Sequence, residues 1–284
     1  MSLLKQIMAT LNSDMFRPKC LRQRLLIKPA LNFWKMIYNA FTAAGGPMLT
    51  LYVILPLLYK SKKFQLPFQF WYPYNTKISP FYEITYLHQV IGLFYSLIAI
   101  YNIDMLIAAL MIVIGAQCDI LSDELRNFKK SSIISSIIHH QEILIFASNC
   151  NKFINFILLG QFFASSVILS LVLYRLALDK RLDIKLLTHL LVVVFYTIQI
   201  FTYCWFGNEV EVKSNQIPFS VYESDWTNYS LKEKKDVMIL ILRSQKPIKL
   251  SAFNLFYLSL ETYIKILRSS WTYLAVLRSI NNLE

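Results

Sequence analysis

Long apolar runs occur throughout this 284-residue chain, and they constrain its fold more than any other feature. The chain is 56% hydrophobic and only 16% charged, whereas soluble domains carry about 25% charged residues. Inside a bilayer every backbone N–H and C=O must be paired within the protein, so apolar runs of about twenty residues are predicted to be helices. We therefore predict an all-α fold, a polytopic membrane helix bundle with cytosolic helical extensions.

The apolar runs and their polar breaks predict two regions, a polar and basic N-terminal segment over 1–30 and a transmembrane helical domain over 31–284. Five membrane spans are expected in the second region, at about 31–59, 85–118, 153–178, 185–206 and 250–277. Gly45-Gly46-Pro47 and Pro56 are expected to break or kink the first span. The second span exceeds one crossing, so its end should continue outside the membrane as an amphipathic helix.

The polar segments between the spans carry further expectations. Asp104 lies about 28 Å along the second helix, which favours an interfacial position over a buried proton relay. The loop over 60–84 is rich in aromatic residues and proline, which suits a membrane–water interface or, alternatively, a folded cap over a pocket. The stretch over 207–249 is polar and should hold one amphipathic helix outside the membrane, over 232–243.

The distribution of basic residues predicts the orientation. Residues 1–30, 119–152 and 207–249 together hold 17 Lys and Arg, while the segments on the opposite side hold 8. The positive-inside rule therefore puts the first set in the cytosol, with the N-terminus inside and the C-terminus outside. The net charge of +12 is explained by these flanking residues, so we expect no nucleic-acid partner.

Several functional classes find no support in the residues. The four cysteines lack CxxC spacing, and His139 and His140 are adjacent and so face different sides of a helix. No metal or cofactor is therefore expected. Since HExxH, GxSxG and glycine-rich phosphate loops do not occur in the sequence, we predict that the chain is not an enzyme. Inverted repeats of broken helices, typical of transporters, are also not visible.

The last predicted span differs from the others because a polar stripe runs along it. Arg268, Thr272, Val276 and Ile280 recur every four residues and share one face, and Ser279 lies beside them. A stripe that is polar at depth and apolar near its end suits a water-filled path closed by a hydrophobic ring. The alternative is that Val276 and Ile280 only pack against neighbouring helices.

Four motifs resemble those of the insect odorant receptor family. They are Trp71-Tyr72-Pro73 after the first span, the pair Tyr222 and Trp226, the run Arg243-Ser244-Gln245-Lys246-Pro247, and Ser259-Leu260-Glu261-Thr262-Tyr263. The resemblance covers essentially the whole chain. It implies an odorant-specific subunit of a ligand-gated, non-selective cation channel in the plasma membrane. The expected partners are small volatile odorants, membrane lipid and a shared co-receptor in a hetero-tetramer.

The resemblance also implies roles for particular residues. Val276 and Ile280 match the gate positions of the family, and Ser279, Thr272 and Arg268 are expected to line the pore. Tyr222, Trp226 and Leu242 lie in a segment predicted to be cytosolic, where exposed aromatic residues favour a contact between subunits, and packing against this chain's own cytosolic helix ends is the alternative. Odorant-binding candidates are aromatic or small polar residues in the outer half of the spans, each of which could instead be an ordinary packing residue: Tyr52, Tyr86, His88, Phe94, Tyr95 and His189.

One difference from the family bears on function. Its members have seven membrane helices, and this chain matches only the third to the seventh, with 1–30 resembling the segment before the third. We therefore expect a truncated or short form of a receptor. The alternative function is a non-conducting membrane protein that inserts and binds the co-receptor without gating.

Overall fold

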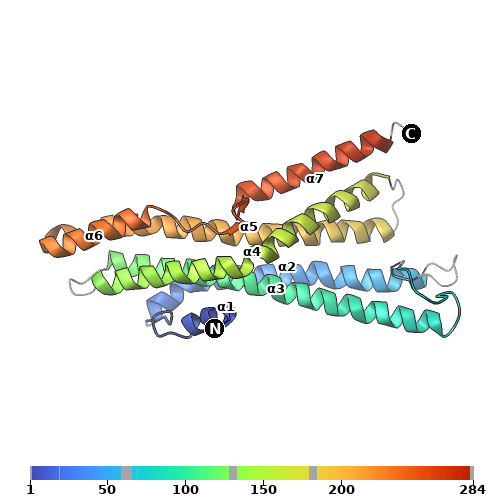
Figure 1. Cartoon of the computed structure of the whole chain (residues 1–284), viewed down its shortest axis with the longest axis horizontal. Helices are drawn as coiled ribbons and strands as arrows, with labels where there is room; N and C mark the ends of the chain where they lie inside the picture. The colour runs from blue at the N-terminus through green and yellow to red at the C-terminus, as the bar shows by residue number, and fades with distance from the viewer. Residues whose placement is uncertain are drawn as a thin grey trace. The chain divides into compact units, whose positions relative to one another are not determined.

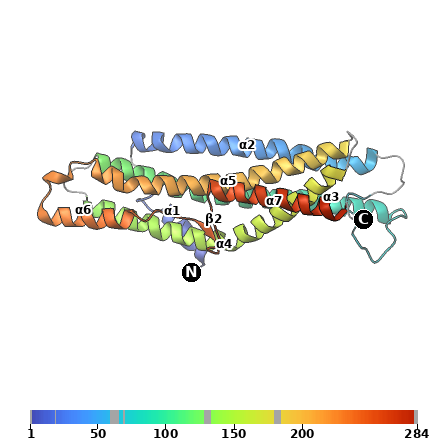
Figure 2. The ribbon, with the colours of Figure 1, turned by 90° about the horizontal axis from the view of Figure 1, so that it is seen from above.

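The computed structural model describes residues 2–18, 20–58, 66–68, 70–127, 133–178 and 184–281. Figures 1 and 2 show these residues as a set of long helices with one short β-hairpin, so the predicted all-α class is confirmed. In chain order the elements are α1 (Leu3–Leu11), α2 (Leu21–Leu58), α3 (Phe81–Arg126), α4 (Ile133–Leu178), α5 (Ile184–Tyr222), the 3-10 helix η1 (Trp226–Asn228), α6 (Leu231–Ser244), β1 (Ser251–Ala252), β2 (Phe256–Tyr257) and α7 (Leu260–Asn281).

The chain forms two compact units, which are described separately. Unit 1 comprises Met1–Met36, Ile107–Ala164 and Phe201–Ile266, and unit 2 comprises Ile37–Leu106, Ser165–Ile200 and Leu267–Glu284. Helices α2, α3, α4, α5 and α7 each contribute residues to both units. Unit 1 therefore contains most of the segments that the charge distribution predicts to be cytosolic.

In unit 1 a chain of buried polar groups joins the N-terminal segment to α3 and α4. The Gln117 amide donates to the carbonyl of Phe16 at 2.9 Å, and its oxygen lies 3.0 Å from Nε2 of His139. The other ring nitrogen of His139 faces Glu124 at 3.5 Å, and Gln23 of α2 donates to the same carboxylate at 3.0 Å. These contacts satisfy polar groups that would otherwise be costly to bury.

The polar stretch after the fourth predicted span is more helical than the sequence suggested. Helix α5 continues through this stretch to Tyr222 because Val210, Ile217 and Val221 lie on one buried face. The chain then turns through η1, and α6 runs back in the opposite sense (Figures 1 and 2). A capping box between Ser230 and Glu233 starts α6, which confirms the predicted amphipathic helix.

The prediction that a helix begins at Leu250 is wrong, because β1 and β2 form an antiparallel hairpin before α7. Ser251 pairs with Tyr257 and Ala252 with Phe256, and Phe253 and Asn254 take positive φ angles of 52° and 55° at the turn. Asparagines of α4 accept the backbone N–H groups here, Asn151 from Ser251 at 2.9 Å and Asn155 from Phe253. These tertiary contacts replace the helical pairing that the apolar sequence predicted.

The first predicted helix also differs in its bounds. Helix α2 begins at Leu21 rather than near residue 31, and it passes through Gly45-Gly46-Pro47 and Pro56 without a break. The Thr50 hydroxyl donates to the carbonyl of Pro47 at 2.9 Å. Membrane helices tolerate proline where side chains or neighbours satisfy the freed backbone groups.

In unit 2 the described part of the loop before α3 is folded onto that helix. The Gln89 side chain accepts from the N–H of Phe68 and donates to its carbonyl, both at 2.9 Å. The Tyr74 hydroxyl lies 3.0 Å from that of Thr85, which is fully buried. This arrangement is closer to the cap alternative for the loop than to a row of independent interfacial aromatics.

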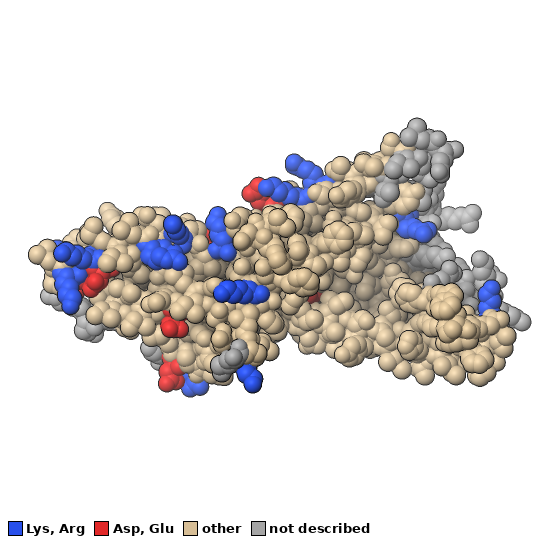
Figure 3. Space-filling model, viewed as in Figure 1, with Lys and Arg blue, Asp and Glu red and all other residues tan. Residues whose placement is uncertain are grey.

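Among the described residues, α3, α4 and α5 are long and apolar enough to cross a membrane. Helices α2 and α7, of 38 and 22 residues, have sufficient length, and their crossing stays a prediction, as do the exact span limits. On the face drawn in Figure 3 charged side chains gather over α6 and the adjoining part of α5, while most of the face is uncharged.

Candidate functional site

Unit 2 contains an apolar pocket of about 220 Å³ between α2, α3 and α5. Helix α2 forms one wall of the pocket. Its lining residues recur every three to four positions and therefore share one face of the helix. Only a few polar groups reach the pocket, as is usual for small-molecule sites. The lining residues are Tyr38, Phe41, Thr42, Gly45, Gly46, Leu97, Ile98, Tyr101 and Phe195.

Two glycines on α2 provide the space for this pocket. A Cβ atom at Gly45 would lie 3.3 Å from the ring of Phe195, so α2 and α5 approach closely only because that position is small. At Gly46 no atom lies within 4 Å of the position that a Cβ atom would take, so this direction is open. The ring of Phe195 meets Phe41 edge-on, with centroids 5.4 Å apart.

One hydroxyl pair gives the pocket a polar edge. The Tyr101 hydroxyl of α3 lies 3.2 Å from Thr42 Oγ1 of α2, and it donates to the carbonyl of Tyr38 at 3.4 Å. Tyr38 and Tyr101 also pack edge-on, with ring centroids 5.1 Å apart. The pocket therefore offers mostly apolar and aromatic surface with hydroxyl groups on one side.

A buried polar cluster lies one helical turn from the pocket. The Gln199 amide of α5 donates to Asp104 of α3 at 2.6 Å, and Ser165 of α4 donates to the Gln199 oxygen at 3.5 Å. All three residues are buried, with exposures of 2% or less. The interfacial interpretation of Asp104 is therefore replaced by a position inside the protein, because Gln199 supplies a partner that depth along one helix cannot reveal.

The six predicted odorant-binding residues do not line this pocket. Tyr52 stacks on Phe68 with centroids 5.8 Å apart, and the Tyr86 hydroxyl donates to the carbonyl of Val53. Three others are exposed on α3 and one is half-buried on α5: His88, Phe94, Tyr95 and His189. Their role in binding stays a prediction.

The predicted pore residues lie on α7, where those with described side chains form an exposed stripe. Arg268, Thr272, Val276 and Ser279 are exposed, Val276 by 51%, and the Thr272 hydroxyl donates to the carbonyl of Arg268 at 3.0 Å. The side chain of Ile280 lies outside the described part of the structure. An exposed apolar residue within a polar stripe is available for contact with water or with another chain.

Of the predicted subunit-contact residues, Tyr222 is the last residue of α5, Trp226 is in η1 and Leu242 is near the end of α6. Tyr222 is 73% exposed and Leu242 is 64% exposed, while Trp226 in η1 is half-buried. Further large apolar side chains are exposed along α6, namely Leu231, Met238 and Ile239. An apolar surface of this kind is typical of an interaction site.

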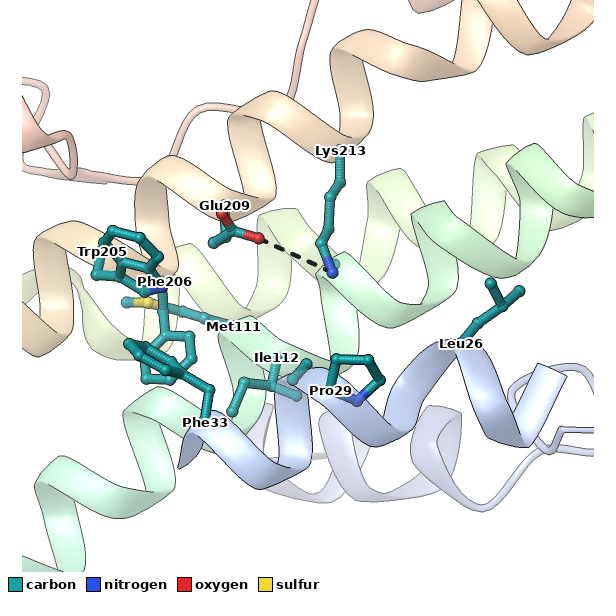
Figure 4. A pocket seen from close by; sticks show the side chains of 11 residues that line it. Leu26, Pro29, Phe33, Met111, Ile112, Trp205, Phe206, Glu209 and Lys213 are labelled. Carbon is teal, nitrogen blue, oxygen red and sulfur yellow. Dashed lines mark ion pairs between the residues drawn. The ribbon is translucent and has the colours of Figure 1, made fainter. Parts of the chain in front are cut away.

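Unit 1 contains a second pocket, of about 210 Å³, that combines an aromatic end with a charged end (Figure 4). Phe33 and Trp205 pack with ring centroids 5.2 Å apart at the first end. At the other end Glu209 lies 4.0 Å from Lys213, the ion pair marked in Figure 4. This pocket is not predictable from the sequence, since its residues come from three separate helices.

Within the described residues no group of three or more His, Cys, Asp and Glu side chains is arranged to hold a metal ion. His139 and His140 belong to the polar packing of unit 1 instead. Burial lowers the pKa of His140 to about 4, with smaller contributions from Arg243 and His139, so its ring is neutral near pH 7. Cys118, Cys150 and Cys204 are buried free thiols, and Cys20 is an exposed one.

Comparisons with known proteins agree on one family. The profile of the 7tm odorant receptor family matches residues 2–271. Odorant receptor 10 of Aedes albopictus is 25% identical over 216 residues, covering 72% of this chain and 57% of that protein. Odorant receptor 46a, isoform A, of Drosophila melanogaster is 21% identical over 294 residues, covering 98% of this chain and 76% of that protein. The chain thus spans less than two thirds of the Aedes receptor.

A solved structure has the same fold. The insect olfactory receptor OR5 from Machilis hrabei, in complex with eugenol, is similar with a TM-score of 0.88 and 18% sequence identity. The match covers 98% of this chain and 74% of that chain. At this level of identity the similarity establishes the arrangement of the helices and nothing finer.

Proposed function

Because the chain belongs to the 7tm odorant receptor family, we propose that it is the odorant-specific subunit of a ligand-gated, non-selective cation channel. It is a multi-pass membrane protein of a family whose members are receptors rather than enzymes. In the proposed arrangement it acts in the plasma membrane with a shared co-receptor, the N-terminus in the cytosol and the C-terminus outside. The exposed apolar surface of α6, with Tyr222, Trp226 and Leu242, is proposed to contact the other subunits.

The apolar pocket of unit 2 is the observation that carries this proposal. Its aromatic walls and single hydroxyl edge suit a small volatile molecule that is mostly apolar, with at most one or two hydrogen-bonding groups. The positive-inside count assigns the loops of unit 2 to the outer side, where such a molecule would arrive. We propose that odorant binds here and biases the channel toward its open state.

Filling this pocket is expected to weaken the response to odorant. In Gly46→Phe a ring would be added at a position that lines the pocket and has open space around it, and it is expected to occupy part of the ligand volume. We expect the odorant concentration for half-maximal current to rise at least about tenfold, about 1.4 kcal/mol of binding free energy. Current would be recorded in cells that also express the co-receptor.

The matched control is Gly92→Phe on α3. A Cβ atom at Gly92 would have open space around it, and Gly92 is not among the residues that line the pocket. Its response should equal that of the unmodified chain. Equal responses of both variants would contradict the pocket assignment. If the unmodified chain reaches the surface with the co-receptor but none of the tested odorants evokes a current, the non-conducting alternative is supported instead.

The gate is proposed to lie on α7, at Val276 and Ile280, with Thr272, Ser279 and Arg268 along the path. Val276→Ser should make a closed hydrophobic ring easier to wet, which would raise current in the absence of odorant. Ile264→Ser is the control, because Ile264 is also exposed on α7 but lies about 120° around the helix. Removing the charge in Arg268→Gln should favour cation passage. Unchanged basal current in Val276→Ser would remove α7 from the path.

A further inference from the structure

The second pocket, in unit 1, changes character along its length. Trp205 and Phe206 line its apolar end, and Glu209 and Lys213 follow one and two turns later on the same helix (Figure 4). Residues 186–208 of α5 contain no Lys, Arg, Asp or Glu. That length is about 35 Å as a helix, so Glu209 is the first charge past an apolar stretch that can cross a bilayer.

The charged end of the pocket holds more negative than positive charge. Lys213 is tightly paired with Asp119, with 2.6 Å between Nζ and the carboxylate, and only 4.0 Å separates it from Glu209. The Lys213 side chain is 18% exposed, whereas that of Glu209 is 39% exposed. Two carboxylates thus face one ammonium group, and Glu209 is the carboxylate held more loosely.

The other basic groups on the α2 wall do not reach this end. Lys28 and Lys35 are exposed and are not among the residues that line the pocket. A ligand with net negative charge would therefore meet the Glu209 carboxylate, and the one lysine that lines the pocket, Lys213, is already paired with Asp119. A ligand with an ammonium group would pair with Glu209 and could also lie against the ring of Trp205, since aromatic faces attract cations.

We propose that this pocket binds the head group of a zwitterionic phospholipid. Its ammonium pairs with Glu209, its phosphate approaches the remaining donor of Lys213, and its first carbons lie along Phe33 and Trp205. The order of these groups, charged at the membrane boundary and apolar toward the membrane, matches the order in the lipid itself. This proposal stands apart from the odorant pocket, which lies in unit 2.

Native mass spectrometry of the whole chain purified in detergent would test the assignment. Phosphatidylethanolamine and phosphatidylglycerol with identical acyl chains would be added separately, because the first is zwitterionic and the second anionic. We expect the unmodified chain to retain the zwitterionic lipid about tenfold more strongly, as for one favourable charge contact. Soluble phosphoethanolamine should compete poorly, because it lacks the apolar part that fills the aromatic end.

Variants identify the site. Glu209→Gln should lose most of the tenfold preference, while Glu211→Gln, two residues away on α5 and paired with Lys249 at 3.0 Å, should keep it. Ala30→Phe, which places a ring in the pocket from α2, should reduce retention of both lipids. Each variant must match the unmodified chain in its gel-filtration profile. If Glu209→Gln fails this check, Ala30→Phe is used to test the site.

Three outcomes would overturn the proposal. These are equal retention of the two lipids by the unmodified chain, stronger retention of the anionic lipid, and retention that neither Glu209→Gln nor Ala30→Phe changes. Competition by soluble phosphoethanolamine at concentrations similar to the lipid would overturn the assignment to a membrane lipid.

Discussion

Gly207→Ala is expected to destabilise the protein strongly, because this position has no room for a methyl group. A Cβ atom there would lie 2.3 Å from Cβ of Leu258 and 2.7 Å from its backbone oxygen. Backbone atoms cannot move aside as the end of a side chain can, and Leu258 is buried, with its N–H bonded to the carbonyl of Leu250 at 2.9 Å. The hairpin that precedes α7 would have to shift.

Overpacking of a core usually costs about 1–3 kcal/mol, and we expect Gly207→Ala to reach about 3 kcal/mol. Thermal unfolding in detergent should show a melting temperature lower by several degrees, and surface expression should fall. The control is Gly160→Ala on α4, where no atom lies within 4 Å of a Cβ atom. That variant should be neutral or more stable by about 0.5–1 kcal/mol, because alanine favours a helix over glycine. Equal melting temperatures of the two variants would contradict the packing argument.

Gly207 also shows what the sequence could and could not predict. The number and order of the long helices follow from apolar runs and their polar breaks, since a chain of this composition has few alternatives to helices. The hairpin over 251–257 could not be found in this way. Its residues are apolar enough for a helix, and the hairpin depends on Asn151 of α4 and on Gly207 of α5, which are distant in the sequence.

The pocket of unit 2 was missed for a different reason. In a soluble helix the polar face marks the side away from the core, but a membrane helix can be apolar on every side. Hydropathy therefore could not separate the exposed candidates Phe94 and Tyr95 from Phe41, which is buried beside the pocket. The available signal was Gly45-Gly46, which was interpreted as a kink and instead allows close packing and leaves space.

The cluster around Asp104 and Gln199 gives the second large effect, and a double-mutant cycle would measure it. Gln199→Leu removes the amide that donates to Asp104 at 2.6 Å and puts an apolar side chain against that side of the buried carboxyl group. Removing one partner of a buried hydrogen bond costs about 1–3 kcal/mol, and more where the remaining group is charged, so this variant should be clearly less stable in detergent. Gln216→Leu, an exposed position on the same helix, is the control and should change little.

The double variant Asp104→Leu with Gln199→Leu is expected to recover much of that loss, because it removes the buried carboxylate and its partner together and leaves an apolar contact. Its melting temperature should therefore exceed that of Gln199→Leu alone. Losses that simply add would show that the two residues act independently.

The response to odorant should fall in the single variant even at equal surface expression, since Asp104 follows Tyr101 by three residues and Gln199 follows Phe195 by four. These spacings put the pair one turn from the pocket on both helices, so the geometry of the pocket walls depends on the hydrogen bond that joins α3 to α5.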